Sequence, residues 1–283
     1  MSRKKSSKKT KKSNVMESVK QQEKERAKRK VYSVIEVDLW STKLHRQEIG
    51  IKRDAERAQK SRQWTKDMDQ IGEIKKDGEK YGIVAIREKL WKTNDIYKKR
   101  FVIKTFTPSE YWRSSIEQLQ GESIADTMAA KEPCISFVCI FQHTNKLAKI
   151  VYVPHKQRFQ GEIFRFSYID DNDVLNSFVI DDKRFTLGSD WVVKNIHNEV
   201  VAFIDSKKFN VGGKVVIKIF DKELAGDKTF INILILFGSM LRYYRDIRKA
   251  VKRLTKELRI SDHKLKLDES EADLYANPRK MNY

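Results

Sequence analysis

The main candidates for a functional site in this sequence are cations near the C-terminal end. Eight Lys and Arg residues lie between positions 242 and 259, with Tyr243 and Tyr244 among them. Guanidinium and ammonium groups bind phosphate through charge-assisted hydrogen bonds, and rings beside them stack on bases or lie at a lipid interface. We expect the following residues to bind an anionic ligand: Arg242, Tyr243, Arg245, Arg248, Lys249, Lys252 and Arg253.

Residue types that serve in catalysis or metal binding form no recognisable pattern. Cys139, His143 and His155 are one loose cluster, and their spacing fits no zinc motif. The acidic run 170–173 lacks the glycine and the closing glutamate of an EF-hand loop. The glycines match no nucleotide fingerprint. We expect no metal, no small-molecule cofactor and no enzyme activity; an active site assembled from distant segments is the alternative left open.

The net charge of +20 is distributed unevenly along the chain. Residues 1–30 contain thirteen Lys and Arg against three Glu, and residues 242–259 contain eight basic against two acidic residues. Concentrated positive charge attracts polyanions. The partner classes that this charge favours are nucleic acid and an anionic membrane surface.

Cysteine usage and hydropathy indicate the compartment. If 134–141 is a strand, Cys134 and Cys139 lie on opposite faces, so we expect no disulfide between them and a reducing environment. The N-terminus has no apolar core of a signal peptide, and no apolar segment has the length of a membrane span. We expect a cytoplasmic location, with peripheral membrane binding or the nucleus as alternatives.

The N-terminal part divides into a tail and an α/β region. Residues 1–30 are rich in Lys, Ser and Glu, so we expect a disordered basic tail that acts as a nuclear address, as a nucleic-acid arm or only as a solubilising segment. Residues 31–130 predict an α/β region. It begins with a strand at Val31–Trp40 and a mostly exposed helix over 46–70.

The second half of the α/β region contains three further signals. Asp77-Gly78 predicts a hairpin, and Phe101–Phe106 predicts a strand. Ser109 is a candidate N-cap for a helix that extends to Ala130 with a break at Gly121. If the strands of this region belong to the sheet that follows, this helix is an insertion.

From residue 131 onward short apolar strands alternate with turn residues. This rhythm predicts an antiparallel barrel or sandwich. The expected strands are Cys134–Phe141, Leu147–Val153, Ile163–Ile169, Val174–Ile180, Trp191–Ile196, Val200–Ile204 and Val215–Phe220.

The segment Phe230–Leu241 is apolar on every side, with Asp227 or Thr229 as its N-cap. A helix of this kind must be enclosed, and about a dozen residues are too few to span a bilayer, so we expect it in the core of the protein. We expect the same helix to continue to Ile260 as a basic rod. A closed sheet around its apolar start satisfies both patterns.

Along the rod, apolar residues recur every three or four positions and form one stripe. An exposed stripe of this kind favours pairing with a partner helix, which is typical of a subunit of a larger assembly. Its residues are Leu241, Tyr244, Ile247, Val251, Leu254 and Leu258.

The run from Phe178 to Ile204 resembles the LURP-one-related family, which belongs with the Tubby C-terminal and phospholipid scramblase superfamily. The matching features are Lys183, the run Phe185-Thr-Leu-Gly188 before a strand, a hairpin, and the run Val200-Val-Ala-Phe-Ile204. The resemblance covers about residues 160–241, and it extends back to residue 83 if the earlier strands belong to it.

The resemblance implies a twelve-stranded barrel around a central apolar helix, for which Phe230–Leu241 is the counterpart, and a phosphoinositide-like membrane ligand. It adds Lys207 and Lys208, which precede the last strand, to the expected ligand-binding residues. The sequence departs from the family at His197-Asn198, where Asp-Gly is frequent, and in the basic extension after Leu241.

These observations predict an α+β, mostly β chain with an antiparallel barrel around a C-terminal apolar helix. The expected divisions are a disordered basic tail at 1–30, an α/β region at 31–130, the barrel at 131–241, a basic amphipathic extension at 242–260 and a polar tail at 261–283. The expected function is non-catalytic recognition of anionic membrane lipid. Nucleic-acid binding and a structural role in a larger assembly are the alternatives.

Overall fold

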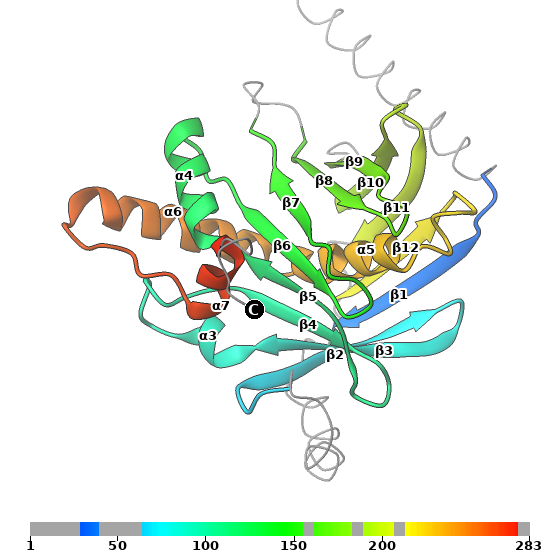
Figure 1. Cartoon of the computed structure of the whole chain (residues 1–283), viewed down its shortest axis with the longest axis horizontal. Helices are drawn as coiled ribbons and strands as arrows, with labels where there is room; N and C mark the ends of the chain where they lie inside the picture. Colours follow the sequence, from blue (N-terminus) through cyan, green and yellow to red (C-terminus); the bar gives the residue numbers. More distant parts are fainter. Residues whose placement is uncertain (1–28, 40–63, 155–160, 183–188, 207–212, 277–283) are drawn as a thin grey trace, which may run out of the picture.

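The computed structural model describes residues 29–39, 64–154, 161–182, 189–206 and 213–276. Within these residues, twelve strands close into an antiparallel barrel, in which β1 pairs with both β2 and β12 (Figure 1). Every other strand pairs with its neighbours in the sequence. The prediction of a mostly-β chain with a closed antiparallel barrel is therefore confirmed.

The strands of the barrel are short (Figure 1). The strands are β1 (Ser33–Leu39), β2 (Met68–Lys76), β3 (Glu79–Arg87), β4 (Val102–Phe106), β5 (Trp112–Gln118), β6 (Ser136–Phe141), β7 (Ala148–Tyr152), β8 (Ile163–Ile169), β9 (Leu175–Asp182), β10 (Ser189–Asn195), β11 (Val200–Ser206) and β12 (Lys214–Ile219). The helices are α3 (Glu88–Lys92), α4 (Gln120–Ala130), α5 (Lys228–Leu241), α6 (Tyr244–Ile260), α7 (Glu269–Ala272) and the 3₁₀ helix η1 (Asp273–Tyr275). Of these, α3, α4, α6 and α7 lie at one side of the barrel, whereas α5 lies among the strands (Figure 1).

Alternation of side chains separates the inside of the barrel from its outside. In β8, Phe164, Phe166 and Tyr168 are buried, whereas Arg165 and Ser167 are exposed. Successive side chains of a strand point to opposite faces of the sheet, so this pattern gives an apolar interior and a polar exterior. The same alternation places Arg165 on the outer surface of the barrel.

The strands before residue 131 belong to the same sheet as those after it. Ile35, Val37 and Leu39 of β1 are fully buried, and Ser33 lies opposite Ile219 of β12. Because β1 closes the barrel against its last strand, the boundary expected at residue 131 does not divide the sheet. Pairing over such a sequence separation leaves no local signal in either strand.

The helix α5 lies among the strands. It is buried from Phe230 to Met240 and contacts β1, β4, β5, β6, β11 and β12. Phe237 also packs against Phe164 of β8 and Trp191 of β10, with ring centroids 5.3 and 5.5 Å apart. A helix that is apolar all round requires such enclosure.

The ends of α5 are fixed by hydrogen bonds. At its start, the Asp227 carboxylate accepts hydrogen bonds from the backbone amides of Thr229 and Phe230 at 2.7 and 3.1 Å, so Asp227 is the N-cap. At its end, the Tyr243 amide donates to the Met240 carbonyl at 2.8 Å, which closes a tight last turn.

The expected continuous helix from Phe230 to Ile260 is wrong, because the chain breaks between α5 and α6. The break coincides with two side-chain anchors. The Arg242 guanidinium donates to the Leu39 carbonyl at 2.9 Å, and the Tyr243 ring packs against Phe101 at 5.3 Å. These contacts hold the junction against the barrel. Because the spacing of apolar residues continues across a break of two residues, this spacing alone does not predict where the helix is interrupted.

The helix expected from Ser109 through Leu119 is also wrong, since Trp112–Gln118 forms β5. This strand pairs with β4 on one side and β6 on the other, and both edges satisfy its backbone groups. A hairpin turn containing Glu110 at φ 63° precedes it. The helix that follows, α4, begins at Gln120 and includes Gly121, so Gly121 does not break it.

The helix expected over 46–70 falls largely outside the described residues, which resume at Trp64. Its last three positions belong to β2, which starts at Met68. The Asp77-Gly78 hairpin joins β2 and β3 as predicted, with both residues at positive φ (52° and 88°).

Candidate functional site

The helix α6 turns its apolar stripe toward the rest of the chain. Tyr244, Ile247, Val251 and Leu254 are buried, and the helix packs against α4. Leu241 and Leu258, at the two ends of the stripe, are half-buried. The stripe that the sequence offered to a partner helix is thus covered by the chain itself.

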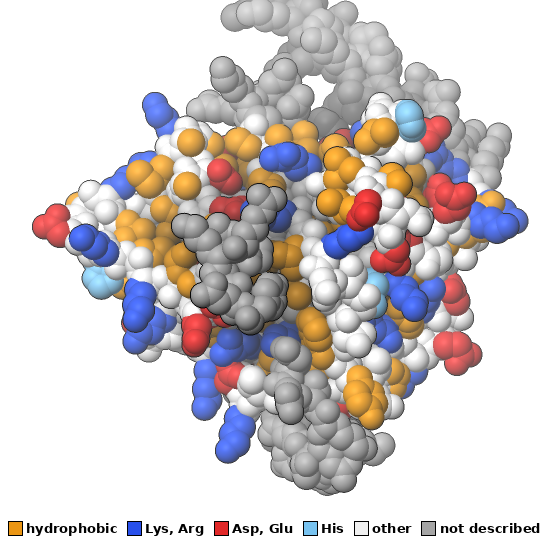
Figure 2. All heavy atoms as spheres, in the orientation of Figure 1, with side chains coloured by type: hydrophobic (Ala, Val, Ile, Leu, Met, Phe, Trp, Pro, Cys, Tyr) orange, Lys and Arg blue, Asp and Glu red, His pale blue; other side chains and the backbone are white. Residues whose placement is uncertain are grey.

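The opposite face of α6 carries a central line of cations, which we call the basic row. Arg245, Lys249, Lys252, Lys256 and Arg259 form this row, and all five are exposed. They follow one another at alternating intervals of four and three residues, which places them along one side of a helix. At 1.5 Å per residue the row is about 21 Å long. In the view of Figure 2, Lys and Arg side chains lie on the side of the molecule where α6 lies in Figure 1 and also on the opposite side, so the row is defined by its residues.

Two of the predicted ligand-binding residues, Arg242 and Tyr243, make contacts at the junction between α5 and α6. The Arg242 guanidinium donates to the carbonyl of Leu39 in β1. The Tyr243 ring lies against Phe101 and edge-on to Trp91, with centroids 5.3 and 6.4 Å apart. Both side chains therefore connect α6 to the barrel.

Arg248 has an internal role as well. It is half-buried, forms an ion pair with Glu162, and lies over the ring of Tyr152 at 5.5 Å. Arg253 is exposed beside the basic row. Of the seven residues predicted on this helix, Arg245, Lys249 and Lys252 lie in the row itself.

Other predicted residues lie outside the described part of the chain. They are Lys207, Lys208, His155, the Lys183–Gly188 part of the family-like motif and nearly all of the N-terminal tail.

A buried cluster around Arg100 is the feature that the sequence did not reveal. Arg100 is 1% exposed; its guanidinium pairs with Glu117 at 3.1 Å and with Asp268 at 3.0 Å. It also donates to the Gln118 carbonyl at 2.9 Å and to the hydroxyl of Ser270. This cluster attaches the segment containing α7, which the sequence predicted to be a polar tail, to β5 of the barrel.

Glu271 extends the Arg100 cluster to α4. Its side chain is fully buried, and its Oε1 accepts a hydrogen bond from the Gly121 amide at 2.9 Å, in the first turn of α4. A carboxylate at this position satisfies a free backbone donor and favours the helix dipole. The C-terminal segment thus caps α4, and α4 in turn packs on α6.

Asp268 and Glu271, two carboxylates of the Arg100 cluster, have opposite pKa shifts. Burial raises the pKa of Glu271 above its ordinary value, and hydrogen bonds from the Gly121 and Gln120 amides only partly oppose this. Burial acts in the same direction on Asp268, but hydrogen bonds from Ser270 and the charge of Arg100 hold its pKa below the usual value.

The Arg100 cluster was missed for a physical reason. Arg100 ends the run Tyr97-Lys-Lys-Arg, which looks like a solvated loop, and Glu117 lies in the strand that the sequence predicted as helix. Each cluster member is an ordinary charged residue, and only the fold brings them together. A charged side chain is buried in this way when it is paired.

An aromatic pair lies beyond the C-terminal end of the basic row. The rings of Tyr97 and His263 are 4.0 Å apart, and His263 is exposed. Exposed lysines lie next to both rings in the sequence: Lys98, Lys264 and Lys266. We call this set the Tyr97–His263 corner.

Within the described residues, potential metal ligands and thiols form no recognisable site. Among them, no three His, Cys, Asp or Glu side chains gather closely enough to hold a metal ion. Cys134 and Cys139 are free and buried, and burial raises the pKa of both thiols. The Asp170 carboxylate accepts hydrogen bonds from the Asn172 and Val174 amides, so it closes a turn. No helix in the described ranges has the length and apolar content to cross a membrane.

Comparisons of the chain with protein-family models, with curated proteins and with solved structures found no match. The functional conclusion therefore depends on geometry. Its main elements are an exposed line of five cations on a helix that is anchored to the barrel at Arg242 and Tyr243 and packed against α4.

Proposed function

We propose that the protein is a non-catalytic binding module that recognises an anionic membrane surface through the basic row of α6. The observation that carries this proposal is the row itself: Arg245, Lys249, Lys252, Lys256 and Arg259 are all exposed on one line. In this proposal α5 is the central helix of the barrel, and the cations of α6 contact the membrane surface.

The basic row lies on a helix that is held against the rest of the chain, and a straight line of cations fits a flat anionic surface. The apolar face of α6 is buried against the chain, so the helix has no apolar stripe left to insert between lipids, and attraction must be electrostatic. Each Lys or Arg near an anionic membrane contributes about 1 kcal/mol. Five residues on one line reach the surface together, because a straight helix meets a plane along its length. The sequence resemblance to the Tubby C-terminal and scramblase superfamily supports the same ligand class.

The test is flotation of the full chain with phosphatidylcholine vesicles, with and without phosphatidylserine or a phosphoinositide at matched anionic charge. A row variant replaces all five cations by Gln. A control variant removes the same number of charges from exposed lysines elsewhere on the barrel and its loops: Lys66, Lys75, Lys80, Lys218 and Lys222. Both variants have the same net charge.

We expect anionic vesicles to bind the wild type and the control, and the row variant to bind at least about tenfold more weakly. Equal losses in the two variants would show that net charge alone drives binding and would reject the row as the site. A preference for phosphoinositide over phosphatidylserine at equal charge would identify the headgroup.

Nucleic-acid binding is the second candidate, and the Tyr97–His263 corner favours it. Bases stack on exposed aromatic rings with a contribution of about 1–3 kcal/mol each, and flanking lysines attract the backbone. Binding of a single-stranded RNA, followed by fluorescence anisotropy in a salt series, tests it. This function predicts a steep loss of affinity with salt and weaker binding by Tyr97→Ala. Vesicle binding that is unaffected by competitor RNA would count against it.

A further inference from the structure

A groove on the outer face of the barrel lies apart from the basic row. It consists of two neighbouring hollows of about 380 and 420 Å³, and both are lined by Val151 of β7 and Arg165 of β8. One hollow extends over β9 toward Ile196, and the other extends toward Ala129 of α4. No residue of the basic row lines either hollow.

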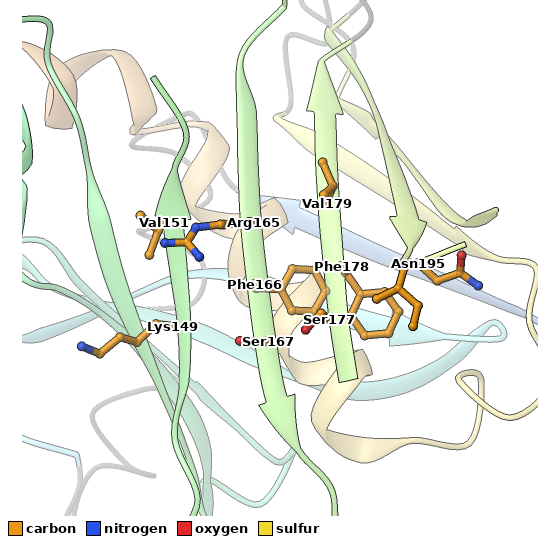
Figure 3. A pocket seen from close by; sticks show the side chains of 10 residues that line it. Lys149, Val151, Arg165, Phe166, Ser167, Ser177, Phe178, Val179 and Asn195 are labelled. Carbon is orange, nitrogen blue, oxygen red and sulfur yellow. The ribbon is translucent and has the colours of Figure 1, made fainter. Parts of the chain in front are cut away.

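Strand register explains why the sheet surface is hollowed here. Ser167 of β8 lies directly opposite Ser177 of β9. Because both side chains are small, they form the bottom of the hollow between larger neighbours. Figure 3 shows Arg165 lying across this face toward Val151. In the register, Arg165 lies between Val151 on one strand and Val179 on the other. The groove thus has a cation flanked by apolar side chains.

Arg165 differs from the cations around it. Lys149 pairs with Glu122 at 2.6 Å, and Lys194 pairs with Asp181 at 3.1 Å. Arg165 is exposed, and the described residues supply it with no hydrogen bond or ion pair. A guanidinium binds a carboxylate with two parallel hydrogen bonds, so an acidic group complements this position.

The surroundings of the groove indicate what kind of ligand fits. β7, β8 and β9 are each paired on both edges, so a ligand cannot add a strand to the sheet. Small-molecule sites bury most of their ligand, whereas these hollows lie side by side on an outer surface. Exposed apolar side chains border one of them, with Val179 39% and Ile196 75% exposed. An elongated surface groove of this kind is complementary to a chain that lies along it.

We infer that this groove binds an extended peptide segment that places an acidic side chain on Arg165 and apolar side chains on Val151, Val179 and Ile196. Asp126 at the α4 end accepts a hydrogen bond from the Ser136 hydroxyl at 3.2 Å. Its negative charge directs the acidic group of the peptide to the Arg165 position. The site is independent of the membrane surface proposed for α6.

The probe is a fluorescein-labelled peptide of about ten residues, which reaches roughly 33 Å when extended. It consists of Ser, Thr and Val with one central Glu. Two matched peptides have Gln or Lys at the centre. The full-length protein is tested as wild type, Arg165→Gln, Arg165→Glu and Ser167→Phe, which fills the floor. Lys218→Gln, an exposed cation on β12, is the control for charge.

We expect the wild type and Lys218→Gln to bind the Glu peptide at least about fivefold more tightly than the Gln peptide. Arg165→Gln should remove this preference, Arg165→Glu should transfer it to the Lys peptide, and Ser167→Phe should weaken all three peptides. Vesicle flotation of Arg165→Gln should match that of Lys218→Gln, which separates this site from the membrane function.

Three results would overturn the inference. The first is that the wild type binds the Glu peptide no better than the Gln peptide, or does not bind it up to about 1 mM. The second is that Arg165→Gln retains the preference. The third is that N-acetylglutamate binds as tightly as the peptide, because a single small carboxylate would then be the occupant.

Discussion

At the scale of single residues, the most heavily constrained side chain is Arg100. Its guanidinium reaches three carboxylates (Glu117, Asp268 and Glu271), one hydroxyl and one backbone carbonyl while it is 1% exposed. A buried ion pair adds little net stability, but removal of one partner leaves an uncompensated buried charge. Arg100 therefore fixes where the C-terminal segment lies more than it adds to the total free energy of unfolding.

Arg100→Met should lower the free energy of unfolding by about 3–5 kcal/mol, because Glu117 and Glu271 then stay buried without their cation. Urea unfolding measures this change. Lys218→Met, at an exposed position, is the control and should change stability by less than about 0.5 kcal/mol. Adding Glu271→Gln to Arg100→Met should recover part of the loss; a fully additive double variant would contradict the coupling.

The pH dependence of stability has two components of opposite sign in this cluster. The pKa of Asp268 is lowered in the folded state, so its contribution is present above its unfolded pKa and is lost as pH falls through the folded pKa, below 3.8. The pKa of Glu271 is raised, so ionised Glu271 opposes folding once the pH exceeds 4.5.

Asp268→Asn should therefore destabilise the protein by about 1 kcal/mol near neutral pH, since the carboxylate is partly exposed and its ion pair is screened. The difference from the wild type should shrink as the pH falls below 3.8. Urea unfolding at several pH values measures it. A difference that is constant over this range would mean that Asp268 does not titrate as described.

At the scale of elements, the junction of α5 and α6 decides how charge is presented. α5 approaches β12 closely at Gly238, where an added Cβ would lie 3.2 Å from Val215 Cγ1. Gly238 thus allows the helix to pack on the strand, and the Arg242 and Tyr243 contacts attach the start of α6 to the barrel.

Gly238→Leu should destabilise the barrel by about 1–3 kcal/mol, because the larger side chain has no free volume against Val215 and Ile217. Gly226→Ala is the matched control, since the nearest atom to its added Cβ is the Glu223 carbonyl oxygen at 3.4 Å. Thermal unfolding compares the two. An unchanged melting temperature for Gly238→Leu would show that α5 is not confined as its contacts indicate.

The sequence predicted the elements that local chemistry defines. The apolar helix, its two cap candidates Asp227 and Thr229, and the Asp77-Gly78 hairpin follow from residue types alone, and the structure selects Asp227 as the cap. β5 was mistaken for a helix because Trp112, Ile116 and Leu119 have helical spacing, and pairing with β4 and β6 overrides that pattern. The Arg100 cluster and the junction at Tyr243 depend on contacts between distant segments, which no local pattern contains.

At the scale of the whole molecule, three sets of contacts connect the core to the charged surface. α5 is buried and contacts strands of the barrel, α4 packs against α6, and the C-terminal segment caps α4 through Glu271. Residues 221–276 are therefore part of the folded unit. The basic row keeps its line because every one of these contacts holds α6 in place.

Removal of residues 221–283 should prevent the strands from forming a stable barrel, since it exposes the interior that α5 fills. We expect loss of a cooperative unfolding transition and binding of the dye ANS, as in a molten globule. Circular dichroism and dye fluorescence measure both. A truncated chain that unfolds cooperatively would contradict the role of α5 in the core.

The most direct measurement of the central claim reports which face of the molecule meets the membrane. A fluorophore at Asp246→Cys lies next to the basic row and leaves its five cations intact, and a fluorophore at Lys218→Cys marks β12; the native cysteines are buried. With anionic vesicles that carry a headgroup quencher, we predict strong quenching at position 246 and little at position 218. Equal quenching at both positions, or quenching at 218 alone, would contradict membrane recognition through the basic row.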